Sequence, residues 1–122
     1  MKFLIVDDSK IARTKTKDFI EAMGYEVVAE AVDGIDAIEK YKKHLPQFMA
    51  IDLEMPNMKG IEASKEILKL NPNVNIILVT SIIDKKELIN ALKIGVKKIL
   101  QKPFTFELFS NSVNELIQGT KR

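Results

Sequence analysis

Acidic, hydroxyl and basic side chains come directly after short apolar runs at four places in this chain. They are Asp7 with Asp8, then Asp52, Thr80 and Lys102. Asp52 is the most informative of them, because it ends the apolar run 48–51 and is followed by Pro56, which stops further strand. A run that is apolar on both sides of its axis is typical of the middle of a parallel sheet. We therefore expect Asp52 to end a buried strand.

Three carboxylates that meet at one edge of a sheet would repel one another. At about 4 Å and an effective dielectric constant of about 20, each like-charged pair costs roughly 4 kcal/mol. Such a cluster either takes up protons or binds cations. Lys102 supplies one positive charge. An all-oxygen site without thiolates suits a hard divalent ion, above all Mg²⁺ with several retained waters.

The same residues are suited to phosphoryl transfer, which requires positioning and charge neutralisation. A metal ion and the Lys102 ammonium would hold Asp52 ionised beside two centres that also attract phosphoryl oxygens. Thr80 adds a hydroxyl donor. An aspartate nucleophile together with Mg²⁺ predicts an aspartyl phosphate. Each residue alone could equally be a helix cap or a turn residue, so the prediction depends on their joint placement.

Alternating apolar runs and helical periodicity predict the elements that position these residues. The expected strands are 3–6, 25–31, 48–51, 76–79 and 99–100. The expected helices are 10–23, 35–43, 61–70, a segment between a cap at Asp84 and Gly95, and 106–118. Their inward-facing residues should include Ile11 in the first helix, Leu88, Ala91 and Leu92 in the fourth, and Leu108 or Phe109 in the last.

Strict alternation of strands and helices with short loops implies parallel strands and right-handed crossovers. Helices must then cover both faces of one open sheet, which predicts a doubly wound α/β sandwich. Ligands of such sheets bind beyond the carboxyl ends of the strands, where the strand order reverses. The polar residues at the strand ends should therefore gather at one edge, with no comparable group after the second strand.

Length and composition narrow the function further. The 122 residues predict a single domain, 1–122, that buries a core without disulfides. The 19 basic and 17 acidic residues are interspersed, which argues against nucleic acid as a partner. The absence of Cys excludes thiolate metal sites and Cys nucleophiles. The apolar run at the N-terminus is too short for a secretion signal or for membrane insertion, so we expect a cytoplasmic protein.

As a set, these motifs resemble the response regulator receiver domain, and the chain looks like a stand-alone, CheY-like member. The motifs are Asp7-Asp8, Asp52 with Pro56 and Gly60 downstream, Thr80-Ser81, and Lys102-Pro103-Phe104. The resemblance covers residues 3–117. It implies a flavodoxin-like (βα)5 three-layer sandwich with the parallel strand order 2-1-3-4-5.

The resemblance also implies a role for each site residue. Asp52 is the expected phosphorylation site and accepts a phosphoryl group from the phosphohistidine of a histidine kinase. Asp7, Asp8, Asp52 and the Glu54 backbone carbonyl are expected to hold Mg²⁺. Thr80 and Lys102 are expected to contact the phosphate, and the Lys102–Pro103 peptide to be cis, which an X-Pro bond adopts at modest cost.

Two residues depart from the usual receiver pattern. Ile99 stands where many receivers carry an aromatic switch residue, three positions before Lys102, so coupling through a ring flip is not expected. Glu54 stands two positions after Asp52, and its side chain could lie over the phosphoryl group. We hypothesise that Glu54 alters the access of water and hence the lifetime of the aspartyl phosphate.

The function expected from the sequence is a phosphorylation-activated switch in two-component signalling, of chemotaxis type or another. It is not an enzyme in the ordinary sense, but a phospho-acceptor that assists its own phosphorylation and dephosphorylation. A downstream protein should read the change on the face of the fourth helix, fifth strand and fifth helix, through Thr80, Ser81, Ile82 and Ile99, because no output domain is expected after the last helix. Two alternatives stay open, a phosphorelay carrier and a Mg²⁺-dependent phosphohydrolase.

Overall fold

The computed structural model describes residues 1–81 and 84–120 of the chain. Within them, five strands alternate with five helices. The strands are β1 (Lys2–Val6), β2 (Glu26–Ala31), β3 (Phe48–Asp52), β4 (Asn75–Thr80) and β5 (Lys98–Gln101). The helices are α1 (Lys10–Ala22), α2 (Gly34–His44), α3 (Gly60–Leu70), α4 (Lys85–Ile94) and α5 (Phe106–Thr120).

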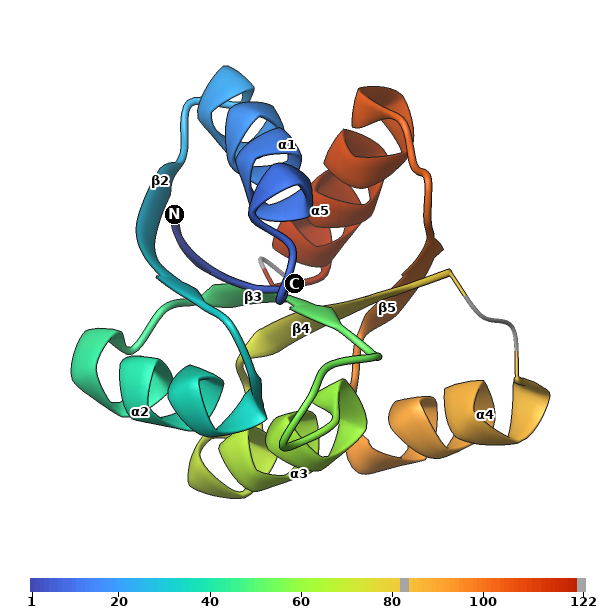
Figure 1. Cartoon of the computed structure of the whole chain (residues 1–122). Helices are drawn as coiled ribbons and strands as arrows, with labels where there is room; N and C mark the ends of the chain where they lie inside the picture. Colours follow the sequence, from blue (N-terminus) through green and yellow to red (C-terminus); the bar gives the residue numbers. More distant parts are fainter. Residues whose placement is uncertain (82–83, 121–122) are drawn as a thin grey trace.

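The strands form one parallel sheet in the order β2-β1-β3-β4-β5. Figure 1 shows α1 and α5 on one face of this sheet and α2, α3 and α4 on the other. The predicted doubly wound, flavodoxin-like sandwich and its strand order are therefore confirmed. Because the order reverses between β1 and β3, the carboxyl ends of these two strands flank the expected ligand site.

Side-chain alternation along the strands builds a separate apolar core on each face of the sheet. In β1, Leu4 and Val6 belong to the core shared with α2, α3 and α4, whereas Phe3 and Ile5 belong to the core shared with α1 and α5. All five residues of β3 are buried. This strand is therefore held between two packed layers, and Asp52 at its end is fixed in position.

Polar side chains start four of the helices, and Thr105 is the one in front of α5. Ser9 Oγ accepts from Ala12 N at 3.2 Å in front of α1, so Ser9 is the cap of this helix. Asp33 Oδ1 accepts from Asp36 N at 2.8 Å in front of α2. Asp33 is thus the cap of α2. Asp84 caps α4 as expected.

Two large apolar residues expected to face inward are exposed instead. Ile11 in α1 is 85% exposed and Leu92 in α4 is 52% exposed. Ala91 is buried in α4 as expected, and of the two candidates in α5 it is Phe109 that is buried, while Leu108 is exposed. The prediction for Leu92 is wrong because α4 covers an edge of the sheet (Figure 1), so that only a narrow stripe of this helix is buried.

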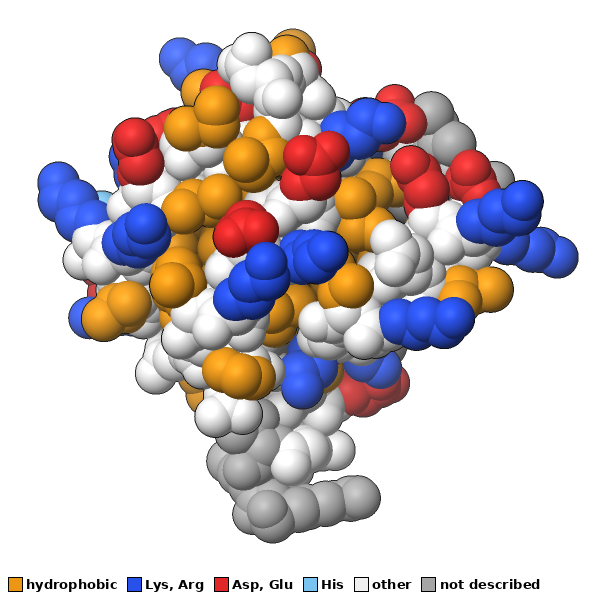
Figure 2. Space-filling view, turned by 90° about the horizontal axis from the view of Figure 1, so that it is seen from below, with side chains coloured by type: hydrophobic (Ala, Val, Ile, Leu, Met, Phe, Trp, Pro, Cys, Tyr) orange, Lys and Arg blue, Asp and Glu red, His pale blue; other side chains and the backbone are white. Residues whose placement is uncertain are grey.

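Charged and apolar side chains are mixed on the face formed by α2, α3 and α4. Figure 2 shows basic, acidic and hydrophobic side chains interspersed across it. This mixture agrees with the small net charge of +2. Across the described residues, every helix is too short or too polar to cross a membrane.

Candidate functional site

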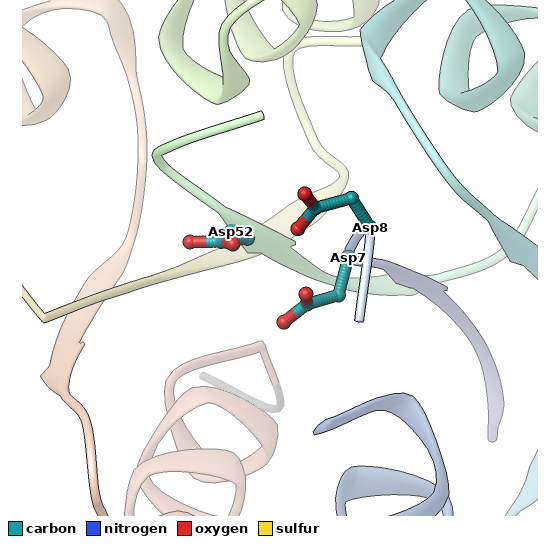
Figure 3. Close-up of side chains that lie close together, drawn as sticks. All are labelled: Asp7, Asp8 and Asp52. Carbon is teal, nitrogen blue, oxygen red and sulfur yellow. The ribbon is translucent and has the colours of Figure 1, made fainter. Parts of the chain in front are cut away.

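The carboxylates of Asp7, Asp8 and Asp52 lie together at the carboxyl edge of the sheet. Asp7 and Asp8 follow β1 directly, and Asp52 is the last residue of the adjacent strand β3. One carboxylate oxygen from each of the three lies within 4.8 Å of the others. Figure 3 shows the three side chains side by side where the two strands end. The fold thus brings together three acids that follow two separate apolar runs in the sequence.

The three acids differ in burial and in their backbone contacts. Asp7 is 4% exposed and Asp52 is 7% exposed, whereas Asp8 faces solvent. Asp7 Oδ1 accepts a hydrogen bond from Ser9 N at 2.9 Å, and Asp52 Oδ1 accepts from Glu54 N at 3.3 Å. Two carboxylates are therefore fixed inside the site, and the third forms its solvent-facing rim.

Lys102 places its ammonium group between the two buried acids. Its Nζ lies 2.7 Å from Asp7 Oδ2 and 3.5 Å from Asp52 Oδ2. Lys102 follows β5 directly, and its backbone N donates to Thr80 O at 2.8 Å, which ties this residue to the end of β4. The peptide bond from Lys102 to Pro103 is cis, as expected. Lys102 thus brings a single positive charge to a cluster of three carboxylates.

This imbalance of charge affects the pKa of Asp52. Burial is the main cause that raises the pKa of the Asp52 carboxyl, and the charge of Asp7 adds to it, while Lys102 opposes both. Burial lowers the pKa of Lys102, but its hydrogen bond to Asp7 and the charge of Asp52 outweigh burial and raise it. Lys102 therefore stays protonated, yet it does not fully offset the cost of ionising Asp52.

The donor atoms of the acid cluster fit a hard divalent cation. All three side chains offer oxygen, which is the ligand type that Mg²⁺ prefers, and Asp8 leaves the site open to solvent for retained waters. A bound cation beside Asp52 would lower the pKa of its carboxyl, as Lys102 does. The residues present therefore suit the ion that the sequence led us to expect.

The remaining residues singled out by the sequence lie around this cluster. Thr80 ends β4 next to the strand of Asp52 and is 1% exposed, while Ser81 is exposed beside it. Ile99 in β5 is half-buried against the core shared with α2, α3 and α4. Glu54 is exposed and follows Asp52 closely in the loop after β3. Ile82 lies outside the described residues.

A groove next to the acid cluster separates the loop after β3 from the start of α4. Asp8 and Glu54 contribute carboxylates to its lining, and Lys59 contributes an amine. The other lining residues are Leu53, Met55, Pro56 and Glu87. Because Asp8 belongs both to the groove and to the cluster, the groove lies directly beside the three acids.

Three hydrogen bonds near the site, made by Arg13 and Asn57, were not predicted from the sequence. Arg13 donates to Asp7 O at 2.8 Å and to Glu30 Oε1 at 3.0 Å, which fixes the backbone of Asp7. Asn57 Nδ2 donates to Asp33 Oδ2 at 2.9 Å. Hydrogen bonds from Asp36 N and then from Asn57 lower the pKa of Asp33. The sequence offered little indication of the contact between Asn57 and Asp33. Asn57 has a left-handed backbone, but Asn is only one of several residues that tolerate it in a loop.

Comparison with known proteins decides the family. The model of the response regulator receiver domain matches residues 3–114. The chain belongs to this family. Receiver domains act in phosphorylation signalling and are regulatory proteins rather than enzymes in the ordinary sense. The resemblance drawn from the sequence motifs is therefore confirmed.

This receiver domain is similar to chemotaxis proteins over nearly its whole length. It is 44% identical to the chemotaxis protein CheY of Thermotoga maritima over 103 residues, which cover 84% of this chain and 86% of the relative. It is 37% identical to CheY of Bacillus subtilis over 116 residues, which cover 95% of this chain and 97% of the relative.

The fold also matches a solved structure closely. A chain in the crystal structure of the CheX–CheY–BeF3–Mg complex of Borrelia burgdorferi superposes with a TM-score of 0.93 at 25% identity. The match covers 96% of this receiver domain and 89% of that chain. The described arrangement of strands and helices is therefore that of the CheY-like proteins.

Proposed function

We propose that this receiver domain is a phosphorylation-driven switch of a two-component system and that Asp52 is its phosphoryl acceptor. The observation that carries the proposal is the position of Asp52, which lies at the end of a fully buried strand with Asp7, Asp8 and Lys102 around its carboxylate. The chemotaxis proteins among its relatives make a chemotaxis pathway the first one to test. The cytoplasmic location expected from the sequence stays a prediction.

In the proposed reaction, an Asp52 carboxylate oxygen attacks the phosphorus of a phosphohistidine on the kinase. The new P–O bond forms as the P–N bond breaks, and the bonding electrons leave with the imidazole nitrogen. The Lys102 ammonium, 3.5 Å from Asp52 Oδ2, neutralises charge on a phosphoryl oxygen. The Thr80 hydroxyl, at the end of the neighbouring strand, donates a hydrogen bond to another.

Mg²⁺ is the cofactor that we propose for this step. Asp7, Asp8, Asp52 and the Glu54 backbone carbonyl would hold it, and when bound it would neutralise phosphoryl oxygens. The all-oxygen cluster of this chain and the Mg in the similar Borrelia complex both support this assignment. The chain's own residues do the rest, because Asp52 attacks and Lys102 favours the ionised form of its carboxylate.

The output of the switch is proposed to be a protein contact on α4, β5 and α5. Phosphorylation would shift the population between two existing arrangements of Thr80 and α4. Ile89 and Leu92 are 53% and 52% exposed on α4, and the surrounding residues Lys85, Lys86 and Lys93 are also exposed. Exposed apolar groups with a charged rim are typical of a contact surface. Half-buried Ile99 cannot flip as an aromatic ring does, so the change must pass through other residues of this face.

The proposal is tested by incubating the protein with acetyl phosphate and Mg²⁺ and measuring its intact mass. We expect the wild type to gain one phosphoryl group and Asp52→Asn to gain none. Asp18→Asn, which removes an exposed carboxylate of α1, is the matched control and should behave as the wild type does. A wild type that never gains the mass would contradict the proposal.

The same protein samples distinguish the switch from the two alternatives left open by the sequence, a phosphohydrolase and a phosphorelay carrier. Repeated turnover of a phosphate monoester would indicate a phosphohydrolase, whereas a single stable uptake of phosphate indicates a switch. Transfer of the phosphoryl group from Asp52 to the histidine of a second protein would indicate a phosphorelay carrier.

A further inference from the structure

The loop after β3 is tied to the start of α2 by two side chains that lie far apart in the sequence. Asn57 Nδ2 donates to Asp33 Oδ2 at 2.9 Å. The other carboxylate oxygen of Asp33, Oδ1, accepts from Asp36 N at 2.8 Å and caps α2. Asp33 therefore fixes the first turn of α2 and the loop at the same time.

Backbone geometry at both ends of this contact is consistent with a close fit. Asn57 has a φ of 68°, in the left-handed region that Asn adopts more readily than most side chains. Gly34 is buried at the start of α2, and a Cβ atom there would lie 2.6 Å from Met58 Cβ and 2.7 Å from Met58 O. The first turn of α2 thus packs directly against the residue that follows Asn57.

The tied loop is also the one that carries Glu54. It is short and internally closed, because Met58 N donates to Pro56 O at 2.8 Å and Gly60 N donates to Leu53 O at 3.0 Å. Only Met55 and Pro56 separate Glu54 from Asn57. An anchor at Asn57 therefore limits the positions that the Glu54 backbone can take relative to Asp52.

We propose that Asn57 and Asp33 are positioning residues for metal binding. They hold the loop 53–59 against α2 and so keep the Glu54 carbonyl at the acid cluster. Neither side chain touches the phosphoryl group. This inference rests on the proposed function, because it gives a task to the Glu54 carbonyl that only a metal-assisted phosphorylation requires.

Three variants separate the hydrogen bond from the backbone conformation. Asn57→Gly removes the amide but allows the positive φ. Asn57→Asp places a carboxylate opposite Asp33 and replaces the hydrogen bond by repulsion. The double variant Asp33→Asn with Asn57→Asp exchanges donor and acceptor and restores the bond, and asparagine is as good a helix cap as aspartate in front of α2. Asn73→Gly, in an exposed loop before β4, is the control for loss of an asparagine.

Two measurements are made on each variant. The first is the Mg²⁺ affinity of the unphosphorylated protein by titration calorimetry. The second is the rate of phosphorylation by acetyl phosphate as a function of Mg²⁺ concentration. Circular dichroism checks that each variant is folded.

We expect Asn57→Gly and Asn57→Asp to weaken Mg²⁺ binding by about tenfold, the low end for residues that orient a metal ligand. The phosphorylation rate at saturating Mg²⁺ should stay as in the wild type, and the double variant should recover most of the affinity. Unchanged affinity in Asn57→Gly, or no recovery in the double variant, would overturn the inference. The variants could change the Mg²⁺ affinity as expected while the wild type never gains a phosphoryl group. That result would contradict the proposed function alone.

Discussion

At the scale of single residues, the electrostatics of Asp52 connect stability with chemistry. Burial and the charge of Asp7 raise its pKa, and Lys102 only partly offsets them. The folded state therefore holds a proton on Asp52 more tightly than the unfolded state does. Stability from this effect is fully present below the unfolded pKa of 3.8 and is lost as the pH rises through the raised folded pKa.

Asp52→Asn should therefore be more stable than the wild type at neutral pH in the absence of Mg²⁺. We expect a gain in the free energy of unfolding of about 0.5 to 2 kcal/mol, as is common when a functional site is relieved of an unfavourable charge. The gain should shrink as the pH falls towards the unfolded pKa of 3.8, because the wild type then becomes protonated. Urea denaturation across a pH series measures it, and a gain independent of pH would contradict this account of Asp52.

Lys102→Met should raise the pKa of Asp52 above its wild-type value. The reason is that the charge of Lys102, 3.5 Å away, is the largest influence that lowers this pKa. Carboxyl ¹³C resonances followed through a pH titration give the value for Asp52 directly. Lys98→Met removes a lysine that pairs with Glu115 instead, and it should leave Asp52 unchanged. A lower or equal pKa in Lys102→Met would show that the ammonium group does not act on Asp52.

Glu54→Asn should speed the decay of the aspartyl phosphate several-fold. Glu54 lines the groove that also contains Asp8, and a shorter side chain leaves more room for the attacking water. The decay is followed by loss of the phosphorylated mass after the donor is removed. Glu87→Gln alters the far side of the same groove and is the control. Equal decay rates in Glu54→Asn and the wild type would remove the hypothesis.

The sequence predicted the chemistry of single residues better than their contacts. Asp7 and Asp52 could be recognised because each ends an apolar run, and parallel strands must bring such ends together. The bond between Asn57 and Asp33 could not be recognised, because it depends on the path of a loop. The difference in burial between Asp7 and Asp8 was equally hidden, since both follow the same strand.

At the scale of elements, the join between β3 and α3 is the tightest place near the site. A Cβ atom added at Gly60 would collide with the backbone of Asp52 and Leu53. Gly60→Ala should therefore lower the free energy of unfolding by about 1 to 3 kcal/mol, as overpacking usually does. Gly119→Ala in α5, where a Cβ meets nothing within 4 Å, is the matched control and should be neutral or stabilising.

Chemical denaturation of both alanine variants measures the difference. Because Gly60 adjoins Asp52, its variant should also phosphorylate more slowly. A Gly60→Ala variant as stable and as reactive as the wild type would show that the loop adjusts without moving Asp52.

The elements themselves were predicted with small errors in their bounds and larger errors in their faces. α2 begins at Gly34 because Asp33 caps it, which adds a residue at the start of the expected helix. Leu92 and Leu108 fit an apolar stripe by spacing, yet both are exposed. Helical periodicity defines an apolar stripe, but it does not say which residues at the edges of that stripe are buried. Their burial depends on where the helix lies on the sheet.

At the scale of the whole molecule, the strand order decides where the site is. Alternation of strands and helices predicts a parallel sheet but does not select the order of its strands. The order 2-1-3-4-5 came from the family resemblance, and the structure confirms it. It places β1 beside β3, so that Asp7 and Asp8 meet Asp52.

Mg²⁺ should stabilise the whole fold through this cluster. A ligand that binds only the folded state at about 100 times its Kd adds about 2.7 kcal/mol to the free energy of unfolding. We expect a gain of this kind for the wild type in urea denaturation, reversed by EDTA, and a much smaller gain for Asp7→Asn. An equal gain in both proteins would place the ion elsewhere.

Phosphorylation should turn the Asp52 carboxylate into a mixed anhydride of a carboxylic acid and phosphate, an acyl phosphate. Borohydride reduces an acyl phosphate to an alcohol, so a phosphorylated aspartate is converted into homoserine in the chain. After treatment with acetyl phosphate and Mg²⁺, peptide mass spectrometry should find homoserine at position 52 alone. Modification at another carboxylate, or none at position 52 in a protein that has gained the phosphoryl mass, would contradict the account.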